Sequence, residues 1–544
     1  MTLKEKIELS QTFKTRKKFE SPKAIALIDT SALSFSKIFI NDSLLQDSIR
    51  KNTAVFYKTN GYKTRWLYSE NHTGLFKSYL DILKNAEDFG LNPETYRYRE
   101  LYYAAKLLYA HPADNESITI LDKEITASFM LFAHHLLHGR IHAPGLKNKI
   151  WEQYDSDRNE ADILLKVSDT EDLEKVVETF HPHSPTYDRM RNKLEYLNTL
   201  PDDSIPQFEF GEDLKYFKSG YKNNKVALLR KNLAKYGFTT NPKDENTVDE
   251  ELTEKIAAFQ ESKEITPDGI PGKRTLYYLN MTRRRQRELL VLNMERMRWL
   301  NKNFKKNAII VNIPHFKLYL LKEGELKLSM NVIVGKEYSP TPIFSAELAY
   351  IEFRPTWTVP QSILRHEMLP KLEKDAAYYT KRGYSVYEND KKIDPSTINW
   401  KDASTKKRVF HFVEQPSKKN SLGLVKFIMP NNMSIYLHDT PSGHLFKKEY
   451  RALSHGCVRV EKPAELAACL LEGQDDWNLE KVERAMLSGK NRNRVYLNKK
   501  FLVQLIYITT WVNEDNEIVI MNDIYGFDDH HLEILRKYDT DKNL

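Results

Sequence analysis

The hydrophobic pattern of the chain changes its period near residue 307, and this change constrains the fold more than any other feature of the sequence. Before it, apolar residues recur every three or four positions, as in 75–86 and 250–260, which predicts amphipathic helices. After it, 308–313, 317–321 and 328–334 show the period of two that predicts β-strands. We therefore expect a multidomain α+β protein, in which helical domains precede a mostly β domain.

One long stretch interrupts the strands of the β region. Residues 361–422 are polar and rich in lysine and tyrosine. A connection of this length is uncommon inside a sheet, so we predict a helical capping subdomain that forms a lid over a site. Further strands and a closing hairpin are predicted at 348–353, 424–429, 434–438, 503–511 and 517–521.

Two features of the helical half resemble binding sites. His134 and His138 are four residues apart, but no glutamate stands between them, so packing or a surface position is favoured over a metal site. The basic helix 283–302 carries six arginines, which we expect to form a solvated face on a helix that links the modules. A short strand is predicted at 54–57.

Charge and hydropathy bear on the kinds of partner. The chain has 83 Lys and Arg against 75 Asp and Glu, and no arginine-rich tail or stacking aromatic module accompanies its basic runs. Nucleic acid is therefore not an expected partner. No run of about 18 apolar residues is present, so no membrane span is expected. Residues 1–6 are polar, and we expect export or membrane association to depend on a signal or anchor that this sequence does not show.

The two cysteines differ in their surroundings. Cys469 lies in an apolar helical run and is expected to be a small buried residue. Cys457 follows His455 and Gly456 in a strand-like run, 19 residues after His438, a spacing that suits adjacent strands joined by a loop. A thiol becomes a nucleophile as a thiolate, and an imidazole can supply the base or the ion-pair partner. The alternatives are an inert thiol and a zinc site of His438, His455 and Cys457, which would lack a carboxylate ligand.

The alternation of side chains along strands extends this candidate site. Tyr436 lies two residues before His438, and Arg459 two residues after Cys457, so each shares a face with its neighbour. We expect Tyr436 to line the pocket and Arg459 to bind a substrate carboxylate or a loop carbonyl. The backbone N–H groups of Gly456 and Cys457 are expected to stabilise an oxyanion, each donor contributing roughly 3 kcal/mol.

Three predicted helices between 218 and 282 carry a set of short motifs. Each motif alone is compatible with an ordinary helix cap. The matching residues are Leu229, Arg230, Leu233, Gly237, Phe259, Gln260, Asp268, Gly269, Gly272, Thr275, Leu279 and Asn280. In this order and at this spacing, they resemble the three-helix peptidoglycan-binding module.

The residues around Cys457 match a longer pattern. His438 is followed by fifteen residues and then by Ser454-His455-Gly456-Cys457. Further matching stretches are 293–300, 340–342, 420–427, 436–440 and 445–446. Over 307–525, the chain resembles an L,D-transpeptidase catalytic domain of the YkuD type, in the large YcbB-like group that adds a scaffold domain, a peptidoglycan-binding module and a capping subdomain.

This resemblance implies roles for the site residues. Cys457 would attack a peptidoglycan stem peptide and form a thioester, while His438 would pair with the thiol and protonate the leaving D-amino acid. The backbone carbonyl of Asp439 would hold the imidazole in one tautomer, and His455 would orient the loop or add a hydrogen-bond donor. The residues expected to contact substrate are Tyr436, Arg459, Ser454 and Trp357, although Trp357 also suits a core position.

The implied function is that of an exported L,D-transpeptidase in the periplasm, which forms 3→3 cross-links between peptidoglycan stems as a monomer without metal or cofactor. Two alternatives stay open. One is hydrolysis on the same fold, by an L,D-carboxypeptidase or an enzyme that releases a wall protein, and the other is a non-catalytic wall-binding scaffold. The expected parts are an N-terminal segment (1–50), a helical scaffold domain (51–217), a peptidoglycan-binding domain (218–282), a linking helix (283–306), a catalytic domain (307–525, with 361–422 as the cap) and a C-terminal tail (526–544).

Overall fold

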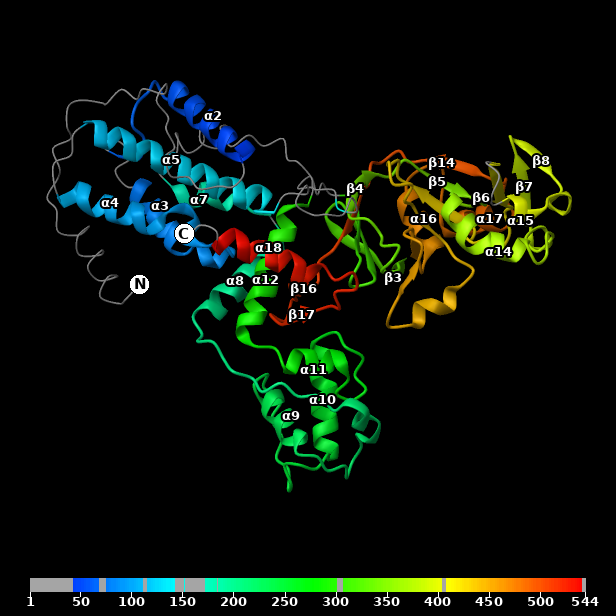
Figure 1. Cartoon of the computed structure of the whole chain (residues 1–544), viewed down its shortest axis with the longest axis horizontal. Coiled ribbons are helices and arrows are strands. Elements are labelled where there is room, and N and C mark those ends of the chain that lie inside the picture. Colours follow the sequence, from blue (N-terminus) through cyan, green and yellow to red (C-terminus); the bar gives the residue numbers. More distant parts are fainter. Residues whose placement is uncertain are drawn as a thin grey trace.

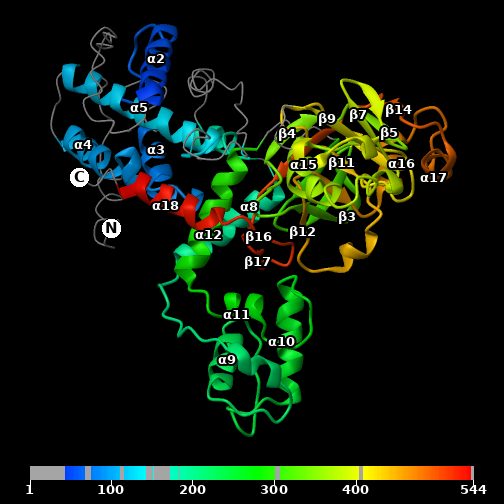
Figure 2. The same ribbon diagram turned by 45° about the vertical axis from the view of Figure 1, so that its right-hand side comes forward.

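The computed structural model describes residues 43–67, 75–110, 115–141, 151, 172–182, 184–300, 307–403 and 408–540. Three lobes surround two central helices, α12 (Arg283–Arg298) and α18 (Phe527–Thr540) (Figure 1, Figure 2). One lobe is the helical scaffold, the second holds three short helices, and the third is rich in strands. The predicted multidomain α+β architecture is therefore confirmed.

The scaffold lobe is organised around α5 (Asn115–His138), which is buried along most of its length. The carboxylate of Asp122 on α5 is fully buried and accepts a hydrogen bond of 2.6 Å from the Tyr57 hydroxyl. It also accepts from the backbone amides of residues 65–67, so it ties the chain after α2 (Ser43–Thr59) to α5. The other helices of this lobe are α3 (Leu75–Lys84), η1 (Ala86–Phe89), η2 (Pro93–Tyr96), α4 (Tyr98–Ala110) and α7 (Leu173–Glu178).

The strand predicted at 54–57 is wrong, because these residues lie within α2. Phe56 and Tyr57 are both buried in the core that α2 shares with α5. Their aromatic character reflects a buried helix face, since packing outweighs the modest preference of such residues for strands.

The second lobe consists of α9 (Lys225–Ala234), α10 (Glu250–Ser262) and α11 (Lys273–Leu279). The Asp249 carboxylate caps α10 by accepting from the Leu252 amide at 2.8 Å. The Gln260 side chain accepts from the Gly269 amide and donates to Asp268, both at 2.9 Å, so it holds the turn before α11. Three of the residues that carried the resemblance to the module, Gln260, Asp268 and Gly269, thus hold the turn between α10 and α11.

The helices at the centre join all three lobes, and two predictions need correction there. Arg296 and Arg298 on α12 are fully buried, although the arginines of this helix were expected to face solvent. The segment 526–544 was expected to be a tail, but most of it forms α18, which packs on α12. Arg296 is paired with Asp528 of α18 at 2.6 Å, and α8 (Pro185–Asn198) packs on another side of α12.

The third lobe contains a long mixed sheet in which neighbours in space are often far apart in sequence. Its strand order is β14-β5-β10-β11-β13-β3-β2-β1-β15-β4, with β12 pairing to β3. The strands are β1 (Ala308–Asn312), β2 (Lys317–Lys322), β3 (Glu325–Gly335), β4 (Phe344–Glu347), β5 (Tyr350–Phe353), β10 (Val425–Ile428), β11 (Leu437–His438), β12 (Ala452–Ser454), β13 (Val458–Val460), β14 (Asn493–Tyr496) and β15 (Leu502–Ile506).

The predicted closing hairpin is only partly correct. β15 pairs in parallel with β1 and belongs to the main sheet. The hairpin itself is shorter and consists of β16 (Thr510–Val512) and β17 (Ile518–Ile520). Two helices, α16 (Pro463–Leu471) and α17 (Leu479–Ser488), lie between β13 and β14 in the sequence.

The prediction of a helical capping segment is only partly correct, because the segment combines short helices with strands. It forms a four-stranded sheet in the order β6-β9-β7-β8, with a hydrophobic cluster of its own that includes Trp400 and Phe412. Aromatic residues alternate with less buried ones along β9, and this period of two was hidden among lysines and tyrosines. The elements are β6 (Trp357–Thr358), α13 (Gln361–Ile363), η5 (Leu364–Met368), α14 (Leu369–Leu372), η6 (Thr380–Arg382), β7 (Tyr384–Glu388), β8 (Lys391–Ile393), η7 (Pro395–Thr397), α15 (Trp400–Ala403) and β9 (Phe410–Glu414).

Neither metal clusters nor membrane-spanning helices are found in the described ranges. The rings of His134 and His138 lie 4.8 Å apart, but no group of three or more potential metal ligands gathers there or elsewhere among the described residues. Within the same residues, no helix combines the length and the apolar character needed to cross a bilayer. The N-terminal segment 1–42 lies outside the described residues.

Candidate active site

Two short parallel strands bring the predicted site residues together. β11 pairs with β13 so that Leu437 lies opposite Val458 and His438 lies opposite Arg459. Leu437 and Val458 are fully buried on one face of the sheet. Because side chains alternate along a strand, His438 and Arg459 lie on the opposite face, as do Tyr436 and Cys457 one step before the paired residues. Cys457 and His438 are therefore diagonal neighbours on one face.

The turn before Cys457 is held by Ser454. Gly456 has a φ of +112°, a conformation that favours glycine over residues with a Cβ. The buried Ser454 hydroxyl accepts from the Gly456 amide at 3.1 Å and donates to the Cys457 carbonyl at 2.6 Å. The Gly456 amide was expected to be an oxyanion donor, but here it is already engaged by Ser454. In the described part of the chain, the Cys457 amide has no hydrogen-bond partner, so it is the donor available to a substrate.

His438 is buried and neutral at physiological pH. Its Nδ1 lies 2.5 Å from the backbone carbonyl of Asp439, which fixes this nitrogen as the protonated one. Burial, followed by the positive charges of Arg459 and Lys426, lowers the pKa of His438 to about 3. A neutral imidazole with its Nδ1 proton bound to a carbonyl can act as a base through Nε2.

The side chain of Asp439 has a separate, structural contact. Its carboxylate accepts from the Leu424 amide at 2.8 Å and from the Thr440 amide at 2.6 Å. A Cβ added at Gly423 would lie 2.3 Å from this carboxyl group, and the φ of Gly423 is +63°, so the loop can approach only because this residue is glycine. Asp439 thus orients His438 with its carbonyl and fixes the adjacent loop with its carboxylate.

The thiol of Cys457 is half-buried and interacts with Tyr436. Burial raises the pKa of the thiol, while hydrogen bonds from Tyr436 and the charge of Arg459 act in the opposite direction. The thiol also lies 3.9 Å from the Ser434 carbonyl. Among the described residues, no hydrogen bond joins the thiol to the His438 ring, whose centroid lies 5.7 Å from that of Tyr436. A proton transfer between Cys457 and His438 would therefore need a small movement of one side chain.

Arg459 carries a positive charge that no carboxylate in the described ranges neutralises. Burial lowers its pKa, and its Nε has no hydrogen-bond partner in the described residues. By contrast, the cations further along the same face are paired, since Glu352 binds Lys426 at 3.1 Å and Arg494 at 2.8 Å. Arg459 is consequently free to bind an anionic group beside Cys457.

The capping subdomain contributes to the site from its own side. Trp357 on β6 lies near enough to the Tyr436 hydroxyl to lower its pKa, and it packs against the hydrophobic cluster of the cap, so it lies between the cap and the site. His455 is exposed, and its Nε2 lies 2.6 Å from the Glu367 carboxylate in η5. His455 therefore connects the Cys457 turn to the cap and is not directed at the thiol.

Sequence reasoning missed two further contacts of the turn. The Thr341 hydroxyl donates to the Gly456 carbonyl at 2.7 Å, and the Thr341 backbone amide donates to the Tyr525 hydroxyl at 3.0 Å. The Pro340-Thr341-Pro342 motif was a signal for Thr341, although not for its role. Nothing local to Tyr525 indicates a contact with residues 184 positions earlier in the chain.

The comparisons with known proteins agree with this arrangement. Residues 306–483 match the YkuD family model, which is described as an L,D-transpeptidase catalytic domain. Residues 51–194 match the Scaffold domain model, and residues 222–279 match a peptidoglycan binding domain model. All three matches lie in the order expected from the sequence.

A Haemophilus influenzae protein described as "Putative L,D-transpeptidase" is 37% identical over 241 residues, which cover 44% of this chain and 48% of that protein. The chain thus spans about half the length of the curated relative it matches. Two solved L,D-transpeptidase structures are each 14% identical to it. The one from Stackebrandtia nassauensis covers 56% of this chain and 97% of its own, with a TM-score of 0.22. The one from Mycobacterium smegmatis covers 37% and 58%, with a TM-score of 0.17.

The assignment of the domains depends on the family models and the Haemophilus influenzae relative, and not on these two structures. Those matches cover the scaffold, the binding module and the domain that holds Cys457. The chain therefore contains a YkuD-type L,D-transpeptidase catalytic domain, a scaffold domain and a peptidoglycan-binding domain.

Proposed function

We propose that this protein transfers acyl groups between peptidoglycan stem peptides through a thioester on Cys457, and so forms 3→3 cross-links. The observation that carries the proposal is the grouping of Cys457, His438, Tyr436 and Arg459 on one face of β11 and β13. A nucleophile, a neutral base, a phenol and an unneutralised cation then surround one point. These are the groups that attack on a peptide carbonyl requires.

In the first half of the reaction, Nε2 of His438 accepts the thiol proton while the Cys457 sulfur attacks the carbonyl that joins the L-centre to the terminal D-residue. The Cys457 amide donates to the developing oxyanion. When the intermediate collapses, the C–N bond breaks, His438 returns its proton to the leaving amine, and the D-amino acid departs. The thioester remains on the enzyme.

In the second half, an amine of another stem attacks the thioester and loses its proton to His438. The C–S bond breaks, the new peptide bond forms the cross-link, and the sulfur regains a proton from His438. The Tyr436 hydroxyl and Arg459 stabilise negative charge on the sulfur as it attacks in the first half and as it leaves in the second, and Arg459 also binds a stem carboxylate. Trp357 and Tyr436 form the wall against which the stem packs.

The other domains support a wall substrate. The peptidoglycan-binding domain matched at 222–279 packs against the β16–β17 hairpin, because the Tyr278 hydroxyl of α11 donates to the Ile520 carbonyl at 3.0 Å. We infer that this lobe holds peptidoglycan near the site, and that the protein acts in the cell envelope. Export would then depend on a signal outside the described residues.

The proposal is tested with tetrapeptide muropeptides and purified protein. The wild type should release D-alanine and yield cross-linked dimers, and Cys457→Ala should reduce dimer formation by at least about a thousandfold, as loss of a catalytic nucleophile does. Cys469→Ala is the matched control, because Cys469 lies on α16 and should leave activity unchanged. Dimers formed equally by Cys457→Ala would contradict the proposal, and tripeptide without dimers would show hydrolysis instead.

A further inference from the structure

The turn that carries Cys457 is fixed by a side chain outside it. Thr341 is fully buried and donates its hydroxyl proton to the Gly456 carbonyl at 2.7 Å. The same hydroxyl oxygen accepts from the Gly335 amide at 2.8 Å. Thr341 therefore links the end of β3 to the residue before the nucleophile. Any shift of Thr341 would be passed to the Gly456 carbonyl and to the adjacent Cys457 amide, since both belong to one planar peptide unit.

Thr341 is itself held by the hydroxyl of Tyr525. This hydroxyl accepts from the Thr341 amide at 3.0 Å and donates to the Gly335 carbonyl at 2.8 Å. It thus closes both ends of the turn from Gly335 to Thr341. The turn is tight, because a Cβ at Gly335 would lie 2.2 Å from the Ser339 carbonyl oxygen. One phenol oxygen therefore sets the position of the whole segment that supports Gly456.

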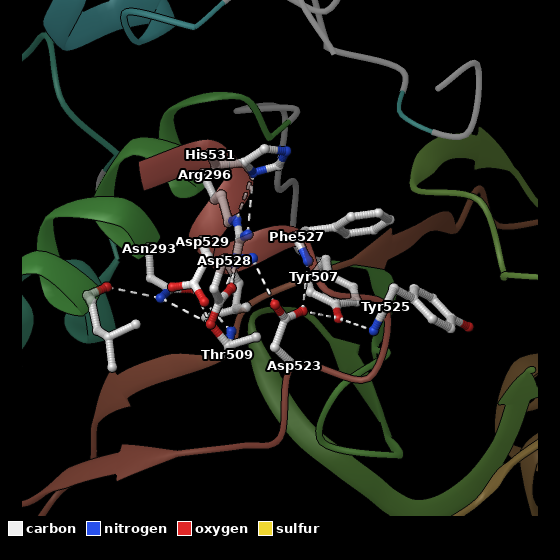
Figure 3. A network of polar contacts seen from close by, with 12 residues as sticks. Asn293, Arg296, Tyr507, Thr509, Asp523, Tyr525, Phe527, Asp528, Asp529 and His531 are labelled. Carbon is white, nitrogen blue, oxygen red and sulfur yellow. Dashed lines mark hydrogen bonds and ion pairs between the residues drawn. The ribbon is translucent and has the colours of Figure 1, made fainter. Parts of the chain in front are cut away.

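The backbone of Tyr525 is anchored in the network that joins the central helices (Figure 3). Its amide donates to the Tyr507 hydroxyl at 2.9 Å, and that hydroxyl donates to Asp523 at 2.6 Å. Asp523 also accepts from the Asp528 amide at 2.6 Å, at the start of α18. Figure 3 shows the Tyr525 ring extending away from this network, and its ring stacks on that of Tyr507 at 5.5 Å.

We propose that Tyr525 is a positioning residue for the acyl-transfer reaction, which acts through Thr341 to hold the Gly456–Cys457 peptide where its N–H meets the oxyanion. This proposal rests on the proposed function of Cys457. It places a functional residue well beyond 483, where the match to the catalytic-domain model ends. It also makes the segment between β17 and α18 part of the catalytic machinery, although no residue of that segment contacts Cys457.

Two variants test the two hydrogen bonds that connect Tyr525 to Gly456 through Thr341. Tyr525→Phe removes the phenol oxygen and keeps the ring, and Thr341→Val removes the hydroxyl at nearly constant volume. Each should lower the rate constant of Cys457 acylation at saturating substrate by about tenfold, because a misplacement of a fraction of an ångström weakens oxyanion binding without removing the nucleophile. KM should change less than about twofold. The double variant should also be about tenfold slower than the wild type and no more, since both changes interrupt the same chain of hydrogen bonds from Tyr525 to Gly456.

Two comparisons separate positioning from general damage. Thr341→Ser keeps the hydroxyl and should restore most of the rate. Tyr319→Phe removes one hydrogen bond elsewhere in the sheet, from the Tyr319 hydroxyl to His315 at 2.9 Å, and should leave acylation unchanged. Alkylation of Cys457 by iodoacetamide needs no oxyanion donor, so it should stay within about twofold of the wild type in every variant. The proposal is overturned if Tyr525→Phe acylates as fast as Tyr319→Phe, or if its alkylation falls as much as its acylation.

Hydrogen exchange does not depend on turnover, so it tests the positioning role of Tyr525 separately from the proposed function. Hydrogen exchange of the peptide spanning 452–460 should be faster in Tyr525→Phe than in the wild type, and unchanged in Tyr319→Phe. Failure of the wild type to form any acyl-enzyme would overturn the proposed function. Unchanged exchange in Tyr525→Phe would overturn the positioning role, whatever the activity.

Discussion

Arg296 is fully buried and Arg459 is half-buried, and the two arginines differ in what surrounds them. The guanidinium of Arg296 donates to Asp528, Thr509 and His531, so its donors are all directed at acceptors (Figure 3). Arg459 lies beside a thiol and a neutral histidine, with no carboxylate within reach among the described residues. The paired charge of Arg296 stabilises one arrangement of the central helices. The charge of Arg459 has no counter-charge among the described residues, so it is available to an anionic ligand.

The same contrast applies to the two neutral histidines beside these arginines. Burial and the neighbouring arginine lower the pKa of His438 to about 3 and that of His531 to about 2. A depressed pKa therefore does not distinguish the active site from the junction. The distinction lies in the neighbours, because His531 accepts from Arg296, while His438 has a half-buried thiol on its own face of the sheet.

The largest expected effect concerns stability at the junction. Arg296→Met should lower the free energy of unfolding by about 3–5 kcal/mol, because it leaves the buried Asp528 carboxylate without its cation. Urea unfolding measures this loss. Arg284→Met is the control, since the Arg284 ion pair with Glu288 is exposed and contributes at most about 1 kcal/mol. Equal losses in the two variants would contradict the comparison.

Arg459→Met should show the opposite behaviour. We expect kcat/KM to fall by about ten- to a hundredfold, as for a lost hydrogen bond to a charged group, while the free energy of unfolding stays the same or rises. Steady-state cross-linking and urea unfolding of the same preparation check both parts. A loss of stability as large as that of Arg296→Met would show that Arg459 has a structural partner after all.

The effect that develops most gradually is in the pH dependence of stability. His438 binds a proton in the unfolded chain below about pH 6.5 but in the folded chain only near pH 3, so its contribution is complete above pH 6.5 and is lost as the pH falls. Relative to His438→Gln, the wild type should lose about 1.4 kcal/mol per pH unit between pH 6.5 and 4. Burial raises the pKa of Asp122 to about 6, so Asp122 changes the stability with pH in the opposite direction. This contribution is the same in the wild type and in His438→Gln, so it cancels when the two are compared.

Urea unfolding at several pH values gives that difference directly. His444→Gln, at an exposed histidine, serves as the control and should follow the wild type. Parallel curves for the wild type and His438→Gln would mean that the imidazole is not held neutral by its surroundings.

Local signals in the sequence were sufficient to predict that Cys457 and His438 lie on neighbouring strands. The spacing of His438 and Cys457 predicts adjacent strands, and β11 and β13 are adjacent. The cap was predicted as an insertion, but its strands were missed because Tyr384–Glu388 and Phe410–Glu414 are short and separated by polar residues. Burial of Arg296 was missed because no property of α12 indicates that Asp528 lies beside it.

Contacts that join distant segments were the least predictable. The hydroxyl of Tyr525 reaches Gly335 and Thr341 only because the fold brings together three segments that have no shared periodicity. The engagement of the Gly456 amide by Ser454 was equally hidden, since a Ser-x-Gly sequence permits this bond without requiring it. Periodicity predicts elements, whereas such contacts follow from tertiary packing.

The parallel pairing of β1 with β15 has a consequence for how the protein is made. Ala308 pairs with Leu502, so most of the catalytic domain must leave the ribosome before the first strand finds its second neighbour. Until then, one edge of β1 stays open and could pair with another nascent chain. Folding of this domain should therefore be largely post-translational, and a chaperone that shields β1 should raise the yield of active enzyme more than one that acts on the scaffold helices.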